Sequence, residues 1–264
     1  MAHTKEFHGK WALVTGASSG IGVALARELA ARGANLILTA RRAERLQVLA
    51  DELIASGVQV LVVPADLCDP NAAEQLYKAT LAADIDVHIL VNNAGLGQFG
   101  PFHQCPLDQE LQQIRVNCEA VVRLSRQFVP QMVARREGWV LVVASTASYQ
   151  PLPYFSTYAA TKVFDRYFAH GLAAEVAPHG VKVTALCPGP TESEFFDVAR
   201  ASIFKARGVQ TATIVARKAV DGLLRGKLSV LPSFDGKLIA FFVRFLPVRL
   251  VTRMVARAAR PPQA

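Results

Sequence analysis

The chain has 264 residues, of which 52% are apolar and 19% charged, so it can bury a large core, and global disorder is excluded. Its net charge of +8 is uneven, because residues 196–264 hold 13 Lys and Arg against 3 Asp and Glu, whereas residues 1–195 hold 16 against 18. This distribution argues against a general nucleic-acid-binding surface and predicts a local basic region in the C-terminal quarter.

No run approaches the roughly 20 apolar residues of a membrane-spanning helix, and the polar segment from Met1 to Lys10 lacks the apolar core of a signal peptide. The four cysteines, Cys68, Cys105, Cys118 and Cys187, are too far apart for a zinc site or a disulfide framework. His103, His170 and His179 likewise lack the spacing of metal ligands. We therefore expect a cytoplasmic protein with reduced thiols and no metal.

Short apolar runs alternate with amphipathic segments along most of the chain. The expected strands are Trp11–Thr15, Asn35–Thr39, Val58–Pro64, Val87–Val91, Trp139–Ala144 and Val181–Leu186. The expected helices lie near 21–32, 43–56, 71–83, 108–136 and 158–177. Strands that are apolar on both faces are typical of a parallel sheet, so this alternation predicts an α/β fold with a doubly wound, Rossmann-like sheet that binds a dinucleotide where the strand order reverses.

The alternation stops near residue 191, and the remainder predicts loop and helices. We expect one catalytic domain over residues 1–233, including a substrate lid at about 191–215. A basic, amphipathic helical extension would follow over residues 234–264.

The first strand leads into a glycine-rich turn and then a helix. A sharp turn, close backbone approach and a helix N-terminus together suit a pyrophosphate, although such a turn can also be purely structural. The candidate cofactor-binding residues in this turn are Gly16, Ser18, Ser19, Gly20, Ile21 and Gly22.

The turn Thr15–Gly22 resembles the cofactor motif of the short-chain dehydrogenase/reductase family. The resemblance continues, in order and spacing, through Asp66-Leu67, Asn92-Asn93-Ala94-Gly95, Asn117, Ser145, Tyr158-x-x-x-Lys162 and Pro188-Gly189. It covers about residues 8–195 and implies an oxidoreductase that moves a hydride between a nicotinamide cofactor and a carbonyl or alcohol.

The end of the second strand bears on the choice of cofactor. Ala40 stands where the family places an acid for the ribose of NAD, and Arg41 follows it, which suits the 2′-phosphate of NADP. Alternatively, Arg41 and Arg42 are solvated charges. The resemblance implies that Asp66 binds the adenine amino group and Asn93 faces the adenosine ribose, while Asn92 ties strand ends together. Leu67, Ala94 and Gly95 complete the nucleotide-binding candidates.

Tyr158 and Lys162 are four residues apart in a helical segment and so share a face. A free tyrosine has a pKa of about 10, which a nearby ammonium lowers, so Tyr158 is the expected general acid/base. By resemblance, Lys162 also holds the nicotinamide ribose, and Ser145 hydrogen-bonds the substrate oxygen. Asn117 would hold a relay water behind Lys162 through a distortion of its helix.

The resemblance implies that the turn Pro188-Gly189 lies next to the nicotinamide carboxamide. Ser193 stands where the family usually has threonine, and Thr191 is a second candidate for the carboxamide ligand.

The pocket segments bring mainly aromatic and aliphatic residues, which favours a small apolar carbonyl or alcohol substrate. The alternative is a protein that binds NADP without catalysis, as a regulator or scaffold. A sugar-nucleotide epimerase is disfavoured by the glycine spacing and by the length of the chain. By resemblance, helices 108–136 and 158–177 would form contacts of a homo-oligomer.

The C-terminal extension contains two amphipathic helices, over 237–246 and from Val248 to Arg260. Apolar residues line one side, and Arg249, Arg253, Arg257 and Arg260 form a stripe in the second helix. Such a segment either packs against protein as a cap or makes weak peripheral membrane contact over 237–260.

Overall fold

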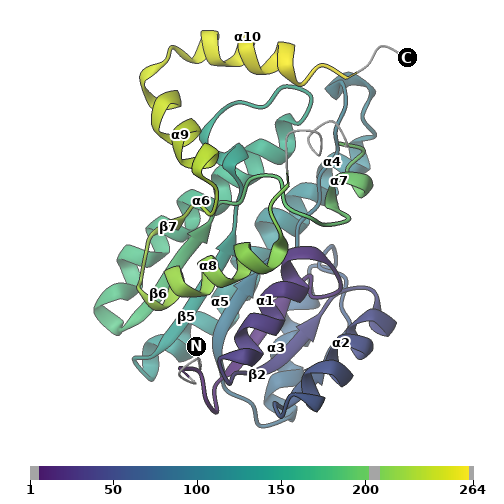
Figure 1. Cartoon of the computed structure of the whole chain (residues 1–264). Coiled ribbons are helices and arrows are strands. Elements are labelled where there is room, and N and C mark those ends of the chain that lie inside the picture. The colour runs from purple at the N-terminus through teal and green to yellow at the C-terminus, as the bar shows by residue number, and fades with distance from the viewer. Residues whose placement is uncertain (1–5, 202–208, 262–264) are drawn as a thin grey trace.

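A computed structural model describes residues 6–201 and 209–261 of the chain. Its centre is a seven-stranded parallel sheet in the order β3-β2-β1-β4-β5-β6-β7 (Figure 1). The strands are β1 (Trp11–Thr15), β2 (Asn35–Thr39), β3 (Val60–Val62), β4 (Val87–Asn92), β5 (Gly138–Val143), β6 (Val181–Leu186) and β7 (Ser229–Val230). The order reverses between β1 and β4, which confirms the doubly wound architecture predicted from the sequence.

All six expected strands are present, and two details differ from the expectation. The run Val58–Pro64 contributes only three residues to the sheet, as β3. The expectation of only loop and helices after residue 191 is wrong, because β7 pairs with β6 through Ala185 and Leu186. A strand of two residues has no periodicity by which a sequence could reveal it.

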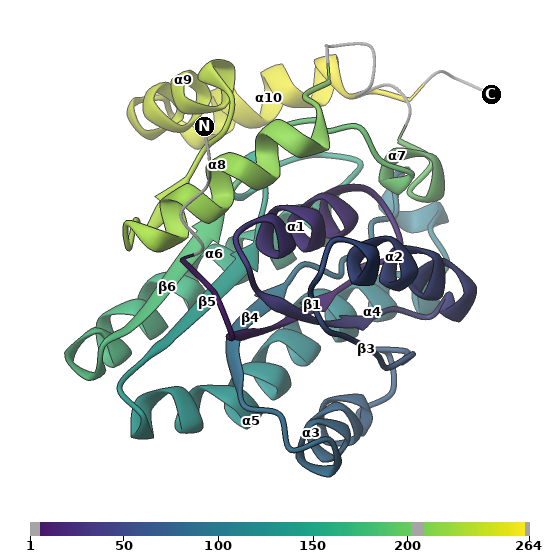
Figure 2. The ribbon, with the colours of Figure 1, turned by 60° about the horizontal axis from the view of Figure 1, so that its bottom comes forward.

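Helices cover both faces of the sheet (Figure 2). One face packs against α1 (Gly20–Ala31), α2 (Ala43–Ala55) and α8 (Ala212–Leu224). The other packs against α3 (Ala72–Ala82), α5 (Ala120–Ala134) and α6 (Ser156–Val176). The helices therefore bury their apolar sides in two separate cores, and the carboxyl ends of the strands remain available for a site.

The segment expected as one helix over 108–136 is divided. It comprises α4 (Leu107–Ile114), a π-helical turn (Arg115–Glu119) and α5, which contains Pro130. Asn117 lies within the π-helical turn, so the helix distortion expected at that residue is present. Such single π-helical turns are frequent at functional sites.

The last part of the chain forms α7 (Phe195–Val198), α9 (Phe234–Phe242), a 3₁₀ turn (Val243–Phe245) and α10 (Val248–Ala258). The expected lid at 191–215 is described only outside residues 202–208. Helices α9 and α10 lie at the opposite end of the molecule from α3 (Figure 1). Within the described ranges, each helix is too short or too polar to cross a membrane.

Candidate active site

A cavity of about 1060 Å³ lies at the carboxyl ends of the strands that flank the reversal of strand order. Its wall includes every candidate cofactor-binding residue of the sequence analysis, together with Ser145, Tyr158 and Lys162. Asn117 does not line it and lies behind it, fully buried. The fold thus gathers at one site motifs that are spread over about 180 residues of sequence.

The turn after β1 has the shape that a pyrophosphate requires. Gly16 has a φ of +65°, and a Cβ there would lie 2.8 Å from Asn93 Nδ2 and 2.9 Å from Ala94 Cα. Ser19 precedes α1 without a side-chain hydrogen bond to the helix, so the first-turn N–H groups have no cap from that residue. Free N–H donors at the positive end of a helix suit a bound diphosphate, so the residues present fit a dinucleotide.

The expectation that Asn92 ties the strand ends together is wrong, because Asn93 makes that connection while also lining the cavity. Asn93 joins the ends of β4 and β1, because its Nδ2 donates to Thr15 O at 2.8 Å and its backbone N–H donates to Thr15 Oγ1. Asn92 Nδ2 instead donates to Ser125 Oγ on α5 at 3.3 Å. Asn92 is the last residue of β4 and Asn93 follows it, and of the two only Asn93 lines the cavity.

A cluster of arginines stands at the nucleotide end of the cavity. Arg42 donates from Nε and Nη2 to Ser18 Oγ and pairs with Glu194 at 2.7 Å, while Arg45 pairs with the same carboxylate at 2.6 Å. Both arginines hold the pKa of the Glu194 carboxyl below its usual value. No carboxylate of the described residues pairs with Arg41, which also lines the cavity. Arg41 is therefore available to an anionic ligand, whereas Arg42 connects Ser18 of the glycine-rich turn to Glu194.

Asp66 uses part of its hydrogen-bonding capacity within its own loop. Its Oδ1 accepts the backbone N–H of Cys68 at 3.0 Å, which is the local turn pattern typical of aspartate. The residue also lines the cavity, and a carboxylate has further acceptor sites. The local turn fixes the side chain and leaves acceptor capacity for a ligand amino group.

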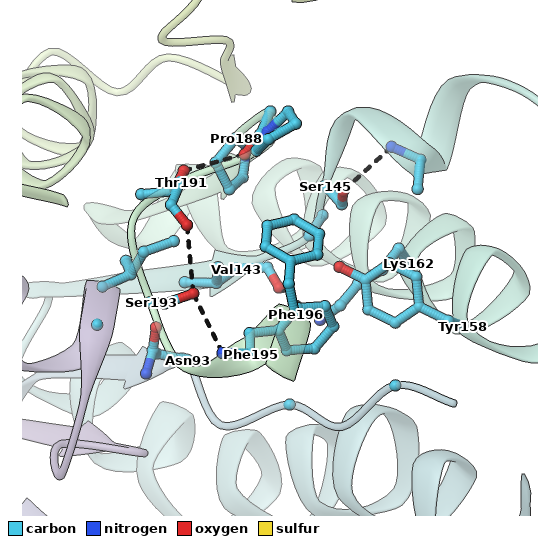
Figure 3. A pocket seen from close by; sticks show the side chains of 18 of the residues that line it. Asn93, Val143, Ser145, Tyr158, Lys162, Pro188, Thr191, Ser193, Phe195 and Phe196 are labelled. Carbon is cyan, nitrogen blue, oxygen red and sulfur yellow. Dashed lines mark hydrogen bonds between the residues drawn. The ribbon is translucent and has the colours of Figure 1, made fainter. Parts of the chain in front are cut away.

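Tyr158 and Lys162 lie on the cavity side of α6, and Ser145 lies two residues after the end of β5 (Figure 3). The Lys162 ammonium is 5.9 Å from the centre of the Tyr158 ring. Burial raises the pKa of Tyr158 above its ordinary value, and the charge of Lys162 and a hydrogen bond with Ser145 oppose that rise. The lowering effect expected from Lys162 is present, but burial outweighs it.

Lys162 is held by two acceptors that the protein itself provides. Its Nζ donates to Val143 O at 2.8 Å and to Asp165 Oδ2 at 2.9 Å. Burial is the largest effect and acts to lower the pKa of Lys162, but the charges of Asp165 and Tyr158 and the hydrogen bond to Asp165 together outweigh it, so the pKa is raised. An ammonium has three protons, so one remains for a ligand hydroxyl or for Tyr158.

Asn117 binds the loop that follows β4. Its Oδ1 accepts from Leu96 N at 2.8 Å, and its Nδ2 donates to Leu96 O and to Thr161 Oγ1, both at 2.9 Å. The side chain therefore connects the π-helical turn to both the loop and α6. Its role in a proton relay stays a prediction.

The two carboxamide candidates differ in their surroundings. Thr191 is 3% exposed, and its hydroxyl donates to Gly189 O at 2.9 Å, whereas Ser193 Oγ donates to Thr191 O at 3.3 Å and accepts from Phe195 N (Figure 3). Both residues line the cavity. The longer contacts of Ser193 make its hydroxyl the easier one to redirect toward a ligand.

Aromatic rings surround Tyr158 on its side of the cavity. Phe155 stacks on Tyr158 with ring centres 4.4 Å apart, and the ring of Phe195 on α7 lies 5.2 Å from the same ring. In Figure 3 the rings of Phe195 and Phe196 lie between Ser193 and Tyr158. Such an apolar surrounding favours apolar ligands.

Sequence reasoning missed Asp165 and Glu194. The position of Asp165, three residues after Lys162, is a helical spacing that could have pointed to the ion pair. Glu194 lies about 150 residues from its arginine partners, and no local pattern joins them.

Comparison with known proteins agrees with this geometry. The model of the short chain dehydrogenase family matches residues 10–203. A very-long-chain 3-oxoacyl-CoA reductase of Podospora anserina is 38% identical over 179 residues, which are 66% of this chain and 53% of that protein. The matched stretch thus spans about half the length of that relative.

Solved structures extend the likeness to nearly the whole chain. A short-chain dehydrogenase from Sphingobium yanoikuyae, in complex with NADPH, is 31% identical with a TM-score of 0.81, covering 97% of this chain and 98% of that one. A short-chain dehydrogenase/reductase from Burkholderia phymatum, in complex with NAD, is 26% identical with a TM-score of 0.84, covering 98% and 99%.

Proposed function

The chain belongs to the short-chain dehydrogenase family, and we propose that it is an NADP-dependent oxidoreductase that interconverts a carbonyl and a secondary alcohol on an apolar substrate. The observation that carries the proposal is the convergence of Ser145, Tyr158 and Lys162 on one cavity, beside a turn shaped for a diphosphate. A protein that only bound the cofactor would not need all three side chains on the same wall.

Arg41 and Ala40 support NADP over NAD. Arg41 lines the cavity without a carboxylate partner among the described residues, so its guanidinium is free for a 2′-phosphate. The alanine before it has no carboxylate to accept the 2′-hydroxyl of NAD. In this proposal Asp66 binds the adenine, Asn93 faces the ribose, and Ser193 takes the carboxamide.

In this proposal, residues of the chain transfer the proton to and from the substrate oxygen. The nicotinamide, when bound, supplies or accepts the hydride. Ser145 holds the substrate oxygen, and the Tyr158 hydroxyl gives its proton to that oxygen during reduction and takes it back during oxidation. Lys162 keeps one proton free to hold the ribose and stabilises the phenolate of Tyr158 by its charge.

The apolar part of the cavity lining supports the substrate class. Leu152, Phe155, Phe195, Ile239 and Met254 are among the lining residues, and a long apolar chain would fit against them. The Podospora relative is named for a very-long-chain 3-oxoacyl-CoA. Long-chain 3-oxoacyl thioesters are therefore the first carbonyl compounds to test.

The test is NADPH consumption, followed by its absorbance, with a panel of 3-oxoacyl thioesters and other ketones of increasing chain length. We expect turnover that improves with chain length. Tyr158→Phe keeps the ring packing and should lower turnover by roughly two to four powers of ten, the usual general-acid contribution, while NADPH still binds. Tyr149→Phe, on a half-buried tyrosine that does not line the cavity, is the matched control.

The same assay tests the alternative of a non-catalytic NADP-binding regulator or scaffold. Tight NADPH binding without turnover of any carbonyl or alcohol in the panel would favour that alternative. Equal turnover of the Tyr158→Phe variant would contradict the assigned proton donor.

We also propose a homo-oligomer that resides in the cytoplasm. Helix α6 exposes Phe164 and Tyr167 on its outer side, at 39% and 64%, which supports a contact between copies there. All four cysteines are free, as they would be in a reducing compartment. Light scattering after size-exclusion chromatography measures the assembly.

A further inference from the structure

Exposed apolar side chains concentrate in the C-terminal helices. Ten of the 24 exposed large apolar residues of the described chain lie between Phe234 and Met254, on α9, the 3₁₀ turn and α10. They are Phe234, Leu238, Ile239, Phe241, Phe242, Phe245, Leu246, Val248, Leu250 and Met254. We call these residues, with the basic ones described next, the C-terminal patch. Monomeric proteins rarely leave contiguous apolar surface of this kind uncovered.

The aromatic rings of the patch contact one another at the surface. Phe241 lies 5.3 Å from Phe242 and 5.2 Å from Phe245, measured between ring centres. These three rings are between 51% and 67% exposed. Since a folded core would have covered rings that belong to it, this cluster is available to something outside the described chain.

The same segment is strongly basic. From Phe234 to Arg260 there is one acidic residue, Asp235, and six basic residues, all of them exposed: Lys237, Arg244, Arg249, Arg253, Arg257 and Arg260. None of the six forms an ion pair with a carboxylate of the described residues. Whatever binds the patch must therefore offer an apolar region for the phenylalanine rings and negative charge for the basic side chains.

The packing of α10 presents both kinds of side chain outward. Val251 is buried at 4% exposure, so the helix is anchored along one side. Leu250 and Met254 are 46% and 57% exposed, and Arg249 and Arg253 are exposed next to them. A helix that presents apolar and basic residues together suits the boundary between lipid tails and headgroups.

A second copy of the chain fits this surface poorly. A twofold contact places the same patch on both sides, so unpaired arginines would face one another with no carboxylates to separate them. An anionic bilayer provides both apolar contact and negative charge, because the phenylalanine rings can insert at its acyl boundary and the arginines can pair with its headgroups.

The patch also adjoins the active site. Ile239 on α9 and Met254 and Val255 on α10 line the cavity that contains Tyr158 and Lys162. Docking through these helices would place this part of the cavity wall next to the lipid, where apolar substrates are concentrated.

We infer that α9, the 3₁₀ turn and α10 dock the protein peripherally on anionic bilayers, with the phenylalanines at the acyl boundary and the arginines on the headgroups. This inference goes beyond the proposed reduction reaction and does not depend on it. Binding to vesicles is measured without substrate, so failure of the docking and failure of the reaction are separate results.

The experiment is co-sedimentation of the full chain with vesicles of phosphatidylcholine, with and without phosphatidylserine. We expect binding that needs phosphatidylserine and weakens as salt is raised. Each arginine near an anionic surface contributes about fivefold in partitioning, so Arg249→Gln with Arg253→Gln should weaken binding about 25-fold. The double variant Phe241→Ser/Phe245→Ser should also release the protein.

Two controls separate docking from damage to the fold. Arg123→Gln with Arg126→Gln removes two exposed charges from α5, and Val48→Ser with Leu81→Ser removes two exposed apolar side chains from α2 and α3. Both controls should bind vesicles as the unmodified chain does. Circular dichroism and NADPH binding verify that every variant is folded.

The inference is overturned if the full chain stays in the supernatant with anionic vesicles, or if the control variants lose as much binding as the patch variants. It is also overturned if the chain does not bind vesicles and light scattering shows a dimer of the unmodified chain that the Phe241→Ser/Phe245→Ser variant no longer forms. The patch would then be covered by a second copy.

Discussion

The carboxylate of Asp165 is buried beside the proposed proton-transfer residues, and replacing it by asparagine tests how charge is balanced there. Its Oδ2 lies 2.9 Å from Lys162 Nζ, and the residue is 1% exposed. At that distance and an effective dielectric constant of about 20, the attraction between the charges is on the order of 6 kcal/mol. Much of it offsets the cost of taking both charges out of water.

Asp165→Asn preserves the size of the side chain and removes its charge, so Lys162 is left buried without a counter-ion. Losing one partner of a buried pair costs about 3–5 kcal/mol in the free energy of unfolding. For a chain of this size that loss lowers Tm by about 10 °C. Differential scanning calorimetry measures this structural part of the effect.

The pH profile isolates the part that bears on chemistry. Asp165 acts to raise the pKa of both Tyr158 and Lys162. Without its negative charge the Tyr158 phenolate forms more readily, so the acidic limb of kcat/KM for alcohol oxidation should move to lower pH. Lys162 also loses its proton more readily, so the alkaline limb should fall at lower pH than in the unmodified enzyme.

The matched control is Asp221→Asn, which removes a carboxylate paired with the buried Arg32 at 2.6 Å, away from the cavity. It should lower Tm and leave the pH profile in place. An Asp165→Asn enzyme with a lower Tm but an unshifted profile, or with a profile moved to higher pH, would refute the reasoning.

Three further predictions concern the cofactor. Arg41→Ala should weaken NADPH about tenfold or more and leave NADH nearly unchanged, since a charged hydrogen bond contributes roughly 1.5–3 kcal/mol; equal losses in fluorescence titrations would contradict the assignment. Glu194→Gln removes the anion that occupies Arg42, so NADPH should tighten relative to NADH, and an unchanged ratio of the two dissociation constants would count against this competition. Gly22→Ala places a Cβ against the Gly16 carbonyl and should abolish NADPH binding in calorimetry, whereas the open helical position Gly171→Ala should not.

The sequence determined the elements and the chemistry that local patterns encode. The six main strands and the helices between them follow from apolar periodicity, which needs only neighbouring residues, as the match of β1, β2 and β6 to their expected bounds illustrates. The spacing of Tyr158 and Lys162 is enough to place both on one helical face, because it depends only on the helical repeat.

The tertiary structure decided what depends on segments that meet only in the fold. It assigned Asn93 rather than Asn92 to the junction of β1 and β4, and it joined Glu194, which precedes α7, to Arg42. It also made burial outweigh Lys162 in setting the pKa of Tyr158. Burial and long-range pairing arise only when the βα units pack together, so they cannot be read from a local stretch of sequence. The charges that set the pKa values in the proposed site are therefore fixed by the folded chain.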